Sequence, residues 1–163
     1  MMSSTHAVGG LSTALIVNHH LLMFGIWDHR LFVLTSASVV GAVLADIDHP
    51  NSLVGRRFKR LSAFLKRKVG RRTLTHSLLS VLLLASLLFV VDSNEWQFLF
   101  YPVLGLLLGH TSHIVLDMLT KQGVALFYPF IKKKKGLGLI STGGYFEIIF
   151  SCIMIFVTTS IVT

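Results

Sequence analysis

Long uncharged segments limit what this chain can fold into more than any other feature of its sequence. Five of them cover residues 1–27, 31–45, 73–91, 96–116 and 148–163. A helix rises about 1.5 Å per residue and the hydrocarbon core of a membrane is about 30 Å thick, so about 20 residues cross it. The first, third and fourth segments are long enough, and the other two nearly so. The sequence therefore predicts an all-α integral membrane protein, a bundle of about five helices.

Composition agrees with one membrane-embedded domain. The chain has 163 residues, of which 53% are hydrophobic and only 13% are charged, which lies outside the range of soluble domains. We expect residues 1–163 to form a single domain. No Lys or Arg precedes the first apolar segment and no small-residue cleavage site is evident, so we expect a retained helix and not a signal peptide.

The basic residues gather in two places. Nine of the fifteen Lys and Arg residues lie between Arg56 and Arg72, and four more are Lys132 to Lys135. Both clusters border apolar segments, which the positive-inside rule explains more simply than nucleic-acid binding, so we expect no nucleic-acid partner. If the helices alternate in direction, both loops and the N-terminus lie on the cytoplasmic side of a multi-pass protein.

The segment 56–72 has a further property. Phe58, Leu61, Leu65 and Val69 recur near helical spacing with Lys and Arg between them. This pattern is typical of an amphipathic helix in the membrane surface, where it would attract anionic lipid. A solvated loop that sets the topology explains the segment equally well.

Alternation of the helices also places most acids and histidines at the cytoplasmic end. Each of these groups would be costly in a membrane unless it were paired, hydrated or bound to a metal. We therefore expect a cluster of metal ligands there. The residues concerned are His6, Asp46, Asp48, His49, His76, His110, His113, Asp117 and Glu147.

The stretch DIDHP supplies three of these groups at the end of the second apolar segment. In a continuous helix Asp46 and Asp48 would point about 200° apart, so they converge only if the helix ends there. Pro50 disfavours the α conformation at His49, which favours such an ending. We interpret the three as ligands; the alternative is a polar helix end beside water.

Two other motifs complete the pattern. His76 would enter the cluster in the first turn of the third span, with Thr73 or Thr75 as the N-cap. The spacing i, i+3, i+7 puts His110, His113 and Asp117 on one helix face, which predicts metal ligands. The alternative is a histidine hydrogen-bonded to an acid that joins two helices.

The remaining two groups allow more than one interpretation. Glu147 begins the fifth span, where it would be a ligand or a carboxylate that complements the helix dipole. Arg72 is explained by the positive-inside rule, although an arginine beside a metal site would also bind the phosphate of a substrate.

The ordered motifs resemble the YdjM family, also called membrane-bound metal-dependent hydrolases. They are a His near the N-terminus, DIDHPxS, RxxTHS, SHxxxDxxTxxG and a later YPF turn, and they cover nearly the whole chain. The resemblance implies a bacterial inner-membrane protein, a helical fold distantly similar to zinc-dependent phospholipase C, and metal-dependent hydrolysis. Position by position, it implies the ligands His6, Asp46, Asp48, His49, His76, His113 and Asp117, with Glu147 matching less closely.

Two departures from the family pattern affect the ligand set. The family often has His-Arg-Gly before its THS, whereas Arg71, Arg72 and Thr73 stand here, so one ligand of the family is missing. His110 is outside the motif and would be an additional ligand.

Together these features predict a metal-dependent hydrolase that acts on a lipid or lipid-linked ester, in particular a phosphoester, at the cytoplasmic leaflet. Imidazole and carboxylate ligands without thiolate suit zinc first, and also manganese or iron, in one or more ions. Asp48 or Glu147 would be the general base, and Arg72 would bind the substrate phosphate. The alternatives are a metal or proton transporter and a structural membrane protein clamped by a metal. The outer halves of the last three spans carry few polar groups, which favours a one-sided site.

Overall fold

The computed structural model describes residues 1–25 and 27–162; Ile26 and Thr163, which belong to the first and last expected spans, lie outside the described residues. Helices and loops make up this part of the chain, with isolated bridges and no strand. The predicted all-α membrane bundle is confirmed. Its apolar helices are α1 (Ser3–Val17), α2 (His29–Leu44), α5 (Leu78–Ser93), α6 (Gln97–Met118) and α7 (Tyr145–Val162), and its short basic helices are α3 (Leu53–Arg57) and α4 (Lys59–Lys68).

Three helical segments are long and apolar enough to cross a membrane, judged by length and composition among the described residues. They are His29–Asp48, Gln97–Met118 and Tyr145–Val162, and the apolar helix Leu78–Ser93 is shorter. The first expected span differs from the prediction, because α1 ends at Val17 and passes into a π-helical turn, Asn18–Leu22. The Asn18 side chain closes this turn by bonding the backbone of Phe24 at 3.0 and 3.1 Å.

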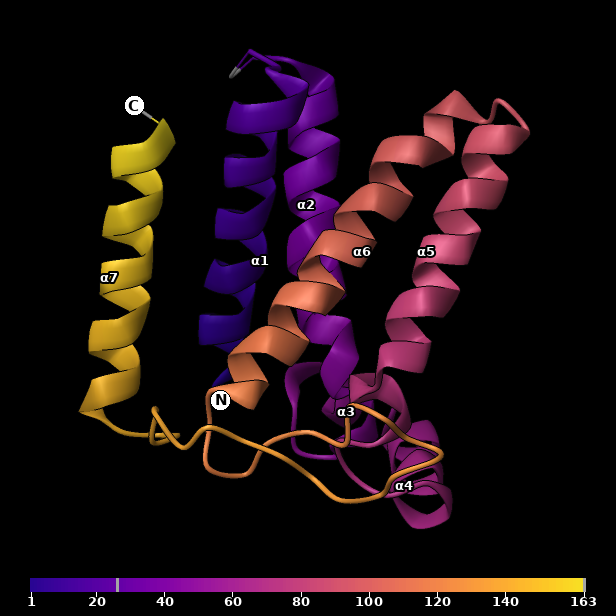
Figure 1. The fold of residues 1–163 in the computed structure, drawn as a ribbon, viewed down its shortest axis with the longest axis vertical. Helices are drawn as coiled ribbons and strands as arrows, with labels where there is room; N and C mark the ends of the chain where they lie inside the picture. The colour runs from indigo at the N-terminus through magenta and orange to yellow at the C-terminus, as the bar shows by residue number, and fades with distance from the viewer. Residues whose placement is uncertain (26, 163) are drawn as a thin grey trace.

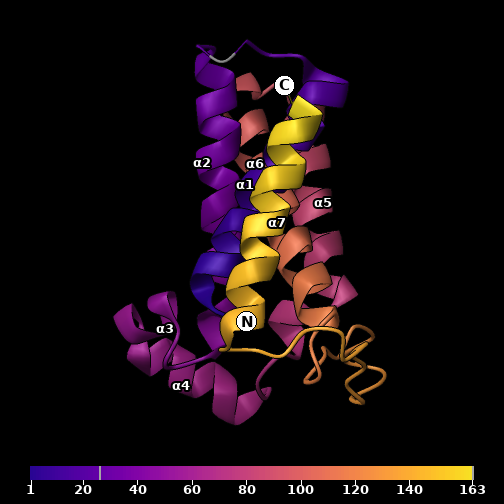
Figure 2. The same ribbon diagram turned by 90° about the vertical axis from the view of Figure 1, so that its left-hand side faces the viewer.

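The apolar helices alternate in direction (Figure 1), as assumed in placing the basic loops. In Figures 1 and 2 they run side by side, with the N-terminus at one end of the bundle and the C-terminus at the other. Helices α3 and α4 lie below the lower end, together with the long connection from α6 to α7 (Figure 1). Both basic loops therefore lie at the end of the bundle where the chain begins.

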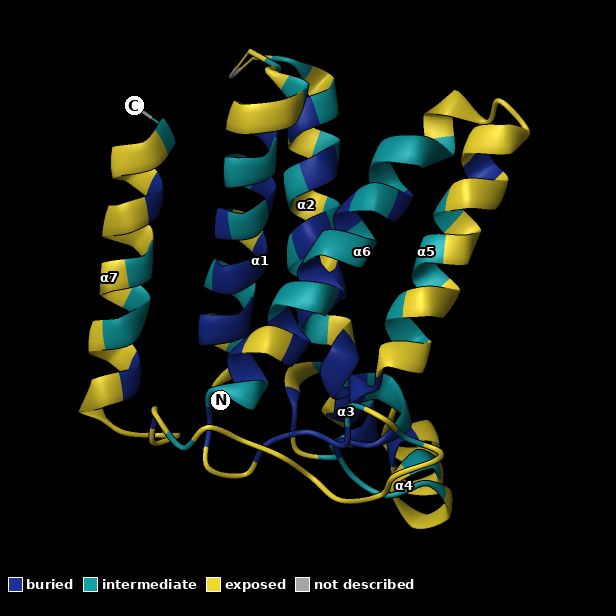
Figure 3. Cartoon of the chain, viewed as in Figure 1, coloured by how far each residue is buried: buried dark blue, intermediate teal, exposed yellow. Residues whose placement is uncertain are grey.

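Small residues let α1, α2 and α6 approach closely, which is how membrane helices associate in the absence of a hydrophobic driving force. A Cβ atom on Gly10 would lie 2.7 Å from the Ser38 carbonyl oxygen, and one on Gly109 would collide with the same atom. The Ser38 hydroxyl donates to the Gly10 carbonyl at 2.8 Å. Figure 3 shows that buried residues concentrate on these three helices, whereas α7 and α5 are mostly exposed.

This close packing leads to the first prediction. Gly109→Ala should lower the free energy of unfolding by about 1–3 kcal/mol, because the added methyl group forces α6 away from the backbone of α2. Thermal unfolding in detergent would measure the change. Gly144→Ala is the matched control, since a Cβ atom there meets nothing within 4 Å. Equal melting temperatures for the two variants would contradict the packing argument.

Candidate metal centre

Helix α2 ends in a turn that brings two carboxylates into the bundle. It passes into a 3-10 turn, Ala45–Asp48, in which Asp46 leaves helical geometry (φ −80°, ψ 18°) and His49 is extended before Pro50. The side chains of Asp46 and Asp48 are both buried. The chain thus ends the helix where convergence of the two acids requires it, as the DIDHP stretch predicts.

His76 enters the site from a different local structure than expected. It lies in a 3-10 turn, Leu74–His76, that precedes α5, and the N-cap position of α5 is Ser77. The expectation that Thr73 or Thr75 caps this helix is wrong, because both hydroxyls have other partners. Thr73 donates to the Val69 and Gly70 carbonyls at the end of α4, and Thr75 lies 2.9 Å from His76 Nδ1.

Four buried side chains from three parts of the chain meet at the lower end of the bundle. His113 and Asp117 lie one turn apart on α6 and are fully buried, and Asp46 and His76 face them. The His76 and His113 Nε2 atoms lie 3.0 Å apart. Asp117 Oδ2 is 3.4 and 3.5 Å from these two nitrogens, and Asp46 Oδ1 is 3.8 and 3.9 Å from them.

These separations fit a single metal ion. Tetrahedral zinc with bonds of about 2.0–2.2 Å places its ligand atoms about 3.3–3.6 Å apart, and the four atoms here all lie within 4.8 Å of one another. Two carboxylate oxygens and two imidazole nitrogens are also ligands that zinc, manganese and iron accept. The buried Asp46–His76–His113–Asp117 group, called the metal group below, can therefore bind a metal ion.

Contacts behind the two histidines orient them. His113 Nδ1 lies 2.5 Å from the Ala42 carbonyl oxygen. Because a carbonyl only accepts, Nδ1 carries the proton and the lone pair of Nε2 points into the metal group. The Thr75 hydroxyl lies 2.9 Å from His76 Nδ1, and when it accepts from that nitrogen it leaves the lone pair of His76 Nε2 directed at the metal group. Such partners are usual behind metal-bound histidines.

The charge and hydrogen bonding of the site also favour a cation. Asp46 Oδ1, Asp48 Oδ1 and Asp117 Oδ2 are buried without a hydrogen-bond partner. Three carboxylates are offset by two buried cations, the Arg72 guanidinium and the Met1 ammonium 3.3 Å from Asp117 Oδ1, which leaves a formal charge of −1 when the histidines are neutral. Buried charge of this size is costly unless it is compensated, and a divalent cation compensates it.

Three further sequence-predicted residues border the metal group. His6 is buried and stacks on His113 with ring centroids 3.5 Å apart, and its Nε2 lies 3.4 Å from Asp117 Oδ1. Asp48 accepts the Arg72 backbone N–H at 2.6 Å through Oδ2. The Arg72 guanidinium donates to Asp117 Oδ1 at 2.8 Å and to Gln122 at 3.0 Å, while its Nε is buried without a partner.

The structure places the last three predicted residues apart from the metal group. His49 is only half-buried, and its Nδ1 accepts the Asn51 backbone N–H at 3.2 Å. His110 Nε2 lies 2.8 Å from the Ser80 hydroxyl and so links α6 to α5. Glu147 accepts from Thr5 Oγ1 at 2.9 Å and from the Met2 and Gly143 backbone N–H groups at 2.5 and 2.6 Å. These are the contacts of a carboxylate that caps the starts of α1 and α7.

The two loops beside the metal group, one before α5 and one between α6 and α7, carry positive charge. Partial burial, followed by repulsion from Arg72 and Arg71, lowers the pKa of Lys134 below its ordinary value. Burial and the nearby Arg71 likewise lower the pKa of His49. A pocket of about 180 Å³ opens here, with Arg71, Arg72 and Thr142 among its lining residues.

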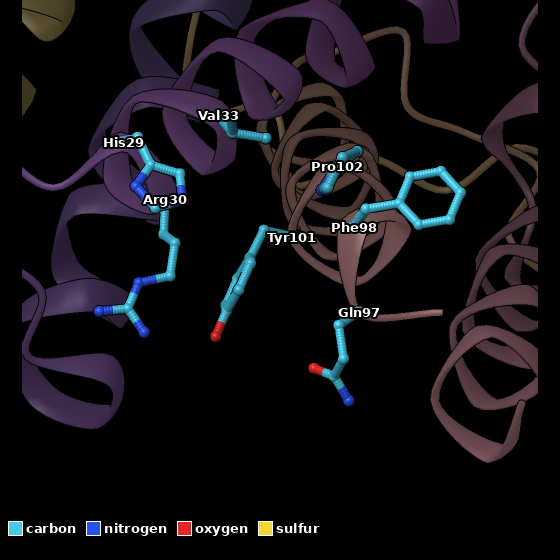
Figure 4. A pocket seen from close by; sticks show the side chains of 7 residues that line it. All are labelled: His29, Arg30, Val33, Gln97, Phe98, Tyr101 and Pro102. Atoms are coloured by element: carbon cyan, nitrogen blue, oxygen red, sulfur yellow. The ribbon is translucent and has the colours of Figure 1, made fainter. Parts of the chain in front are cut away.

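A different pocket, of about 480 Å³, lies at the opposite end of the bundle, where α2 and α6 begin. Figure 4 shows the polar ends of Arg30, Tyr101 and Gln97 extending the same way from its wall. Arg30 is already paired with Asp28 at 2.6 Å, and this contact lowers the pKa of Asp28 to about 2. The pocket contains none of the predicted ligands.

Sequence reasoning missed the partners that orient the site. Thr75 lies inside the THS motif, so its position beside a ligand was a usable signal. The Ala42 carbonyl belongs to the backbone and has no sequence signal at all. The pairing of Arg72 with Asp117 and Gln122 depends on how the segment before α5 meets the end of α6 and the residues after it.

Comparisons with known proteins agree with the sequence motifs. The profile of the family described as YdjM inner membrane protein matches residues 1–162. The inner membrane protein YdjM of Escherichia coli (strain K12) is 37% identical over 109 residues, which are 67% of this chain and 54% of that protein. YvsG of Bacillus subtilis (strain 168) is 28% identical over 149 residues, 90% of this chain and 85% of that protein. The chain spans about half the length of the YdjM proteins it matches, and no solved structure matches it significantly.

Proposed function

The chain belongs to the YdjM inner membrane protein family, and from this premise we propose that it is a metal-dependent hydrolase of a lipid phosphoester at the cytoplasmic face of the bacterial inner membrane. The observation that carries the proposal is the metal group itself, with its two imidazole nitrogens and two carboxylate oxygens buried at one end of a membrane bundle. Its orienting contacts and uncompensated charge support a bound ion over a purely structural cluster.

The proposed ion is zinc, with manganese or iron as alternatives. Asp46, His76, His113 and Asp117 would hold it. When bound, such an ion lowers the pKa of a coordinated water and offsets the charge of phosphoryl oxygens. His6 and Asp48 border the group and would complete the ligand set if a second ion binds.

Three residues of the chain would serve the reaction directly. Asp48 would accept the proton of the attacking water, and the burial of its Oδ1 without a hydrogen-bond partner supports this role. The oxygen of that water would form the new bond to phosphorus while the bond to the lipid alkoxide breaks, and the alkoxide would take up the proton that Asp48 had accepted. The unpartnered Arg72 Nε and the Arg71 guanidinium would bind the phosphoryl oxygens in the small pocket beside them.

The depth of the buried charges supports a hydrolase more than a transporter. An ion path needs polar groups through the whole membrane. Among the described residues, the buried titratable side chains all lie in the half of the bundle that contains the metal group. This is the half where α1 begins and where α2 and α6 end. A site open to one leaflet suits hydrolysis of a lipid head group.

A direct assay tests this proposal. The purified protein, loaded with zinc, manganese or iron, is incubated with a panel of phospholipids and lipid phosphates in mixed micelles. We expect phosphate or phosphoalcohol release that a chelator abolishes and added metal restores. Release that is equal with and without chelator, or no release with any metal and lipid, would overturn the proposal.

The proposed orientation is tested separately. In a Cys152→Ser background, Lys133→Cys should react with a membrane-impermeant thiol reagent only from the cytoplasmic side. Ser93→Cys, at the opposite end of the bundle, should react only from outside. The reverse labelling pattern would place the metal group at the outer leaflet and contradict the cytoplasmic assignment.

A further inference from the structure

A cavity larger than the pocket beside the metal group lies in the apolar part of the bundle. It is a groove of about 620 Å³ lined by α1, α5, α6 and α7. Helix α7 packs mainly against α1 and stands well away from α5 (Figure 1). The groove lies between α7 and α5, and α1 and α6 form its floor.

The lining of the groove fits hydrocarbon. Most of its side chains are aliphatic, among them Val81, Leu108 and Met154. Besides Ser12, four residues with hydroxyl groups line the groove, and each of these four hydroxyls donates to a carbonyl of its own helix at 2.8 or 2.9 Å. These hydroxyls belong to Thr13, Thr111, Ser112 and Thr158.

One end of the groove reaches the turns that carry the metal group. Ser112 and Leu116 line the groove and immediately precede His113 and Asp117 on α6. On α1, the lining residue Gly9 lies one turn after His6. A chain lying in the groove would thus have its end beside the ligands.

We propose that the groove holds an acyl chain of an anionic membrane lipid whose phosphate head group lies at the metal centre. This inference rests on the proposed function and names its substrate class: a lipid that enters sideways from the bilayer between α5 and α7. Charge complementarity supports the anionic head group, because Arg72, which is paired with Asp117 at 2.8 Å, and Arg71 both line the small pocket beside the metal group.

The groove would act by positioning the lipid and not by raising its affinity. Lipid tails are as apolar as the groove, so moving a chain from the bilayer into it yields no hydrophobic gain. Preference for the lipid must come from the charged head group. The groove instead fixes where the phosphoester lies, and a displacement of about 1 Å can cost on the order of 10²-fold in rate.

Photo-crosslinking in nanodiscs tests the groove without requiring turnover. The probe is phosphatidylglycerol with a diazirine on one acyl chain, and crosslinked residues are mapped by mass spectrometry. We expect crosslinks to groove residues of α6 and α7, lost in Ala85→Trp, which fills the groove from α5. Ser86→Trp is the matched control, because Ser86 is exposed on the same helix and is not among the residues that line the groove.

A second pair of variants, on α7, keeps the test decisive if Ala85→Trp fails to fold. Val157 lines the groove and Ile155 does not, although the two are similarly exposed. Val157→Trp should remove the crosslinks and Ile155→Trp should keep them. Filling the groove should also slow hydrolysis of a long-chain lipid at least about tenfold while sparing a short-chain soluble phosphoester.

The outcomes separate this inference from the proposed function. The inference that the groove holds an acyl chain would be overturned by crosslinks that Ala85→Trp and Val157→Trp leave unchanged, or by crosslinks between two copies at the groove. Either result would stand even if hydrolysis is found. Groove-specific crosslinks without hydrolysis of any lipid would support the groove as a lipid-binding site and refute the proposed hydrolase function.

Discussion

Asp117→Asn should remove the metal and destabilise the protein by about 3–5 kcal/mol, because it breaks a buried ion pair at its most connected member. Asp117 Oδ1 accepts from Arg72 at 2.8 Å, and its Oδ2 lies within 3.5 Å of the His76 and His113 Nε2 atoms. Removing its charge leaves the buried Arg72 guanidinium without an anionic partner.

Thermal unfolding and metal content would be measured together for this variant. Asp92→Asn is the control, since Asp92 is exposed near the end of α5 and far from the site. It should behave like the unmodified protein. If Asp117→Asn kept both its stability and its metal, Asp117 would be neither a ligand nor the partner that Arg72 requires.

Asp48→Asn should have the opposite profile, with metal and fold kept and turnover lowered about 10²–10⁴-fold. An amide keeps the shape of the carboxylate, and its oxygen still accepts the Arg72 backbone N–H, but it cannot accept a proton from water. Hydrolysis rates and metal content of the same preparation would show the two effects separately.

Glu147→Gln is the matched comparison for the base. Its carboxylate already accepts from Thr5 and from two backbone N–H groups, so we expect the amide to weaken the cap and leave the rate nearly unchanged. A large loss of turnover in Glu147→Gln, with Asp48→Asn active, would reverse the roles of the two residues.

The bundle was predictable because membranes impose simple rules on a sequence. Apolar length identified the helices, and counting Lys and Arg placed the two basic loops at one end. Spacing alone put His113 and Asp117 on one face of α6, because side chains one turn apart on a helix are neighbours. These inferences need no knowledge of tertiary contacts.

Local geometry outside the helices was less predictable. His76 lies in a 3-10 turn before α5, and the first apolar segment is broken at Asn18. Both features involve hydrogen bonds between a side chain and a nearby backbone group, from Ser77 and from Asn18, which apolar length does not reveal. The cap formed by Glu147 requires the starts of α1 and α7 to meet, which no local pattern encodes. Spacing also placed His110 with the ligands, whereas its partner is Ser80 on α5.

The amphipathic segment was anticipated in outline. Residues 53–68 form α3 and α4 with a break at Phe58, where φ is −114° and ψ is 51°. Leu61 and Phe64 are exposed below the bundle, and Ser62 is buried against it. This placement is compatible with contact between the exposed apolar side chains and the membrane surface, which stays a prediction.

Metal content of the purified protein tests the central claim most directly. Protein prepared without chelator, or reconstituted with zinc, manganese or iron, should contain about one tightly bound ion per chain. His113→Ala should lose it, and His110→Ala, which alters a histidine on the same helix outside the metal group, should keep it. If the unmodified protein binds none of these ions stoichiometrically, or if His113→Ala retains the ion, the buried group is not a metal centre.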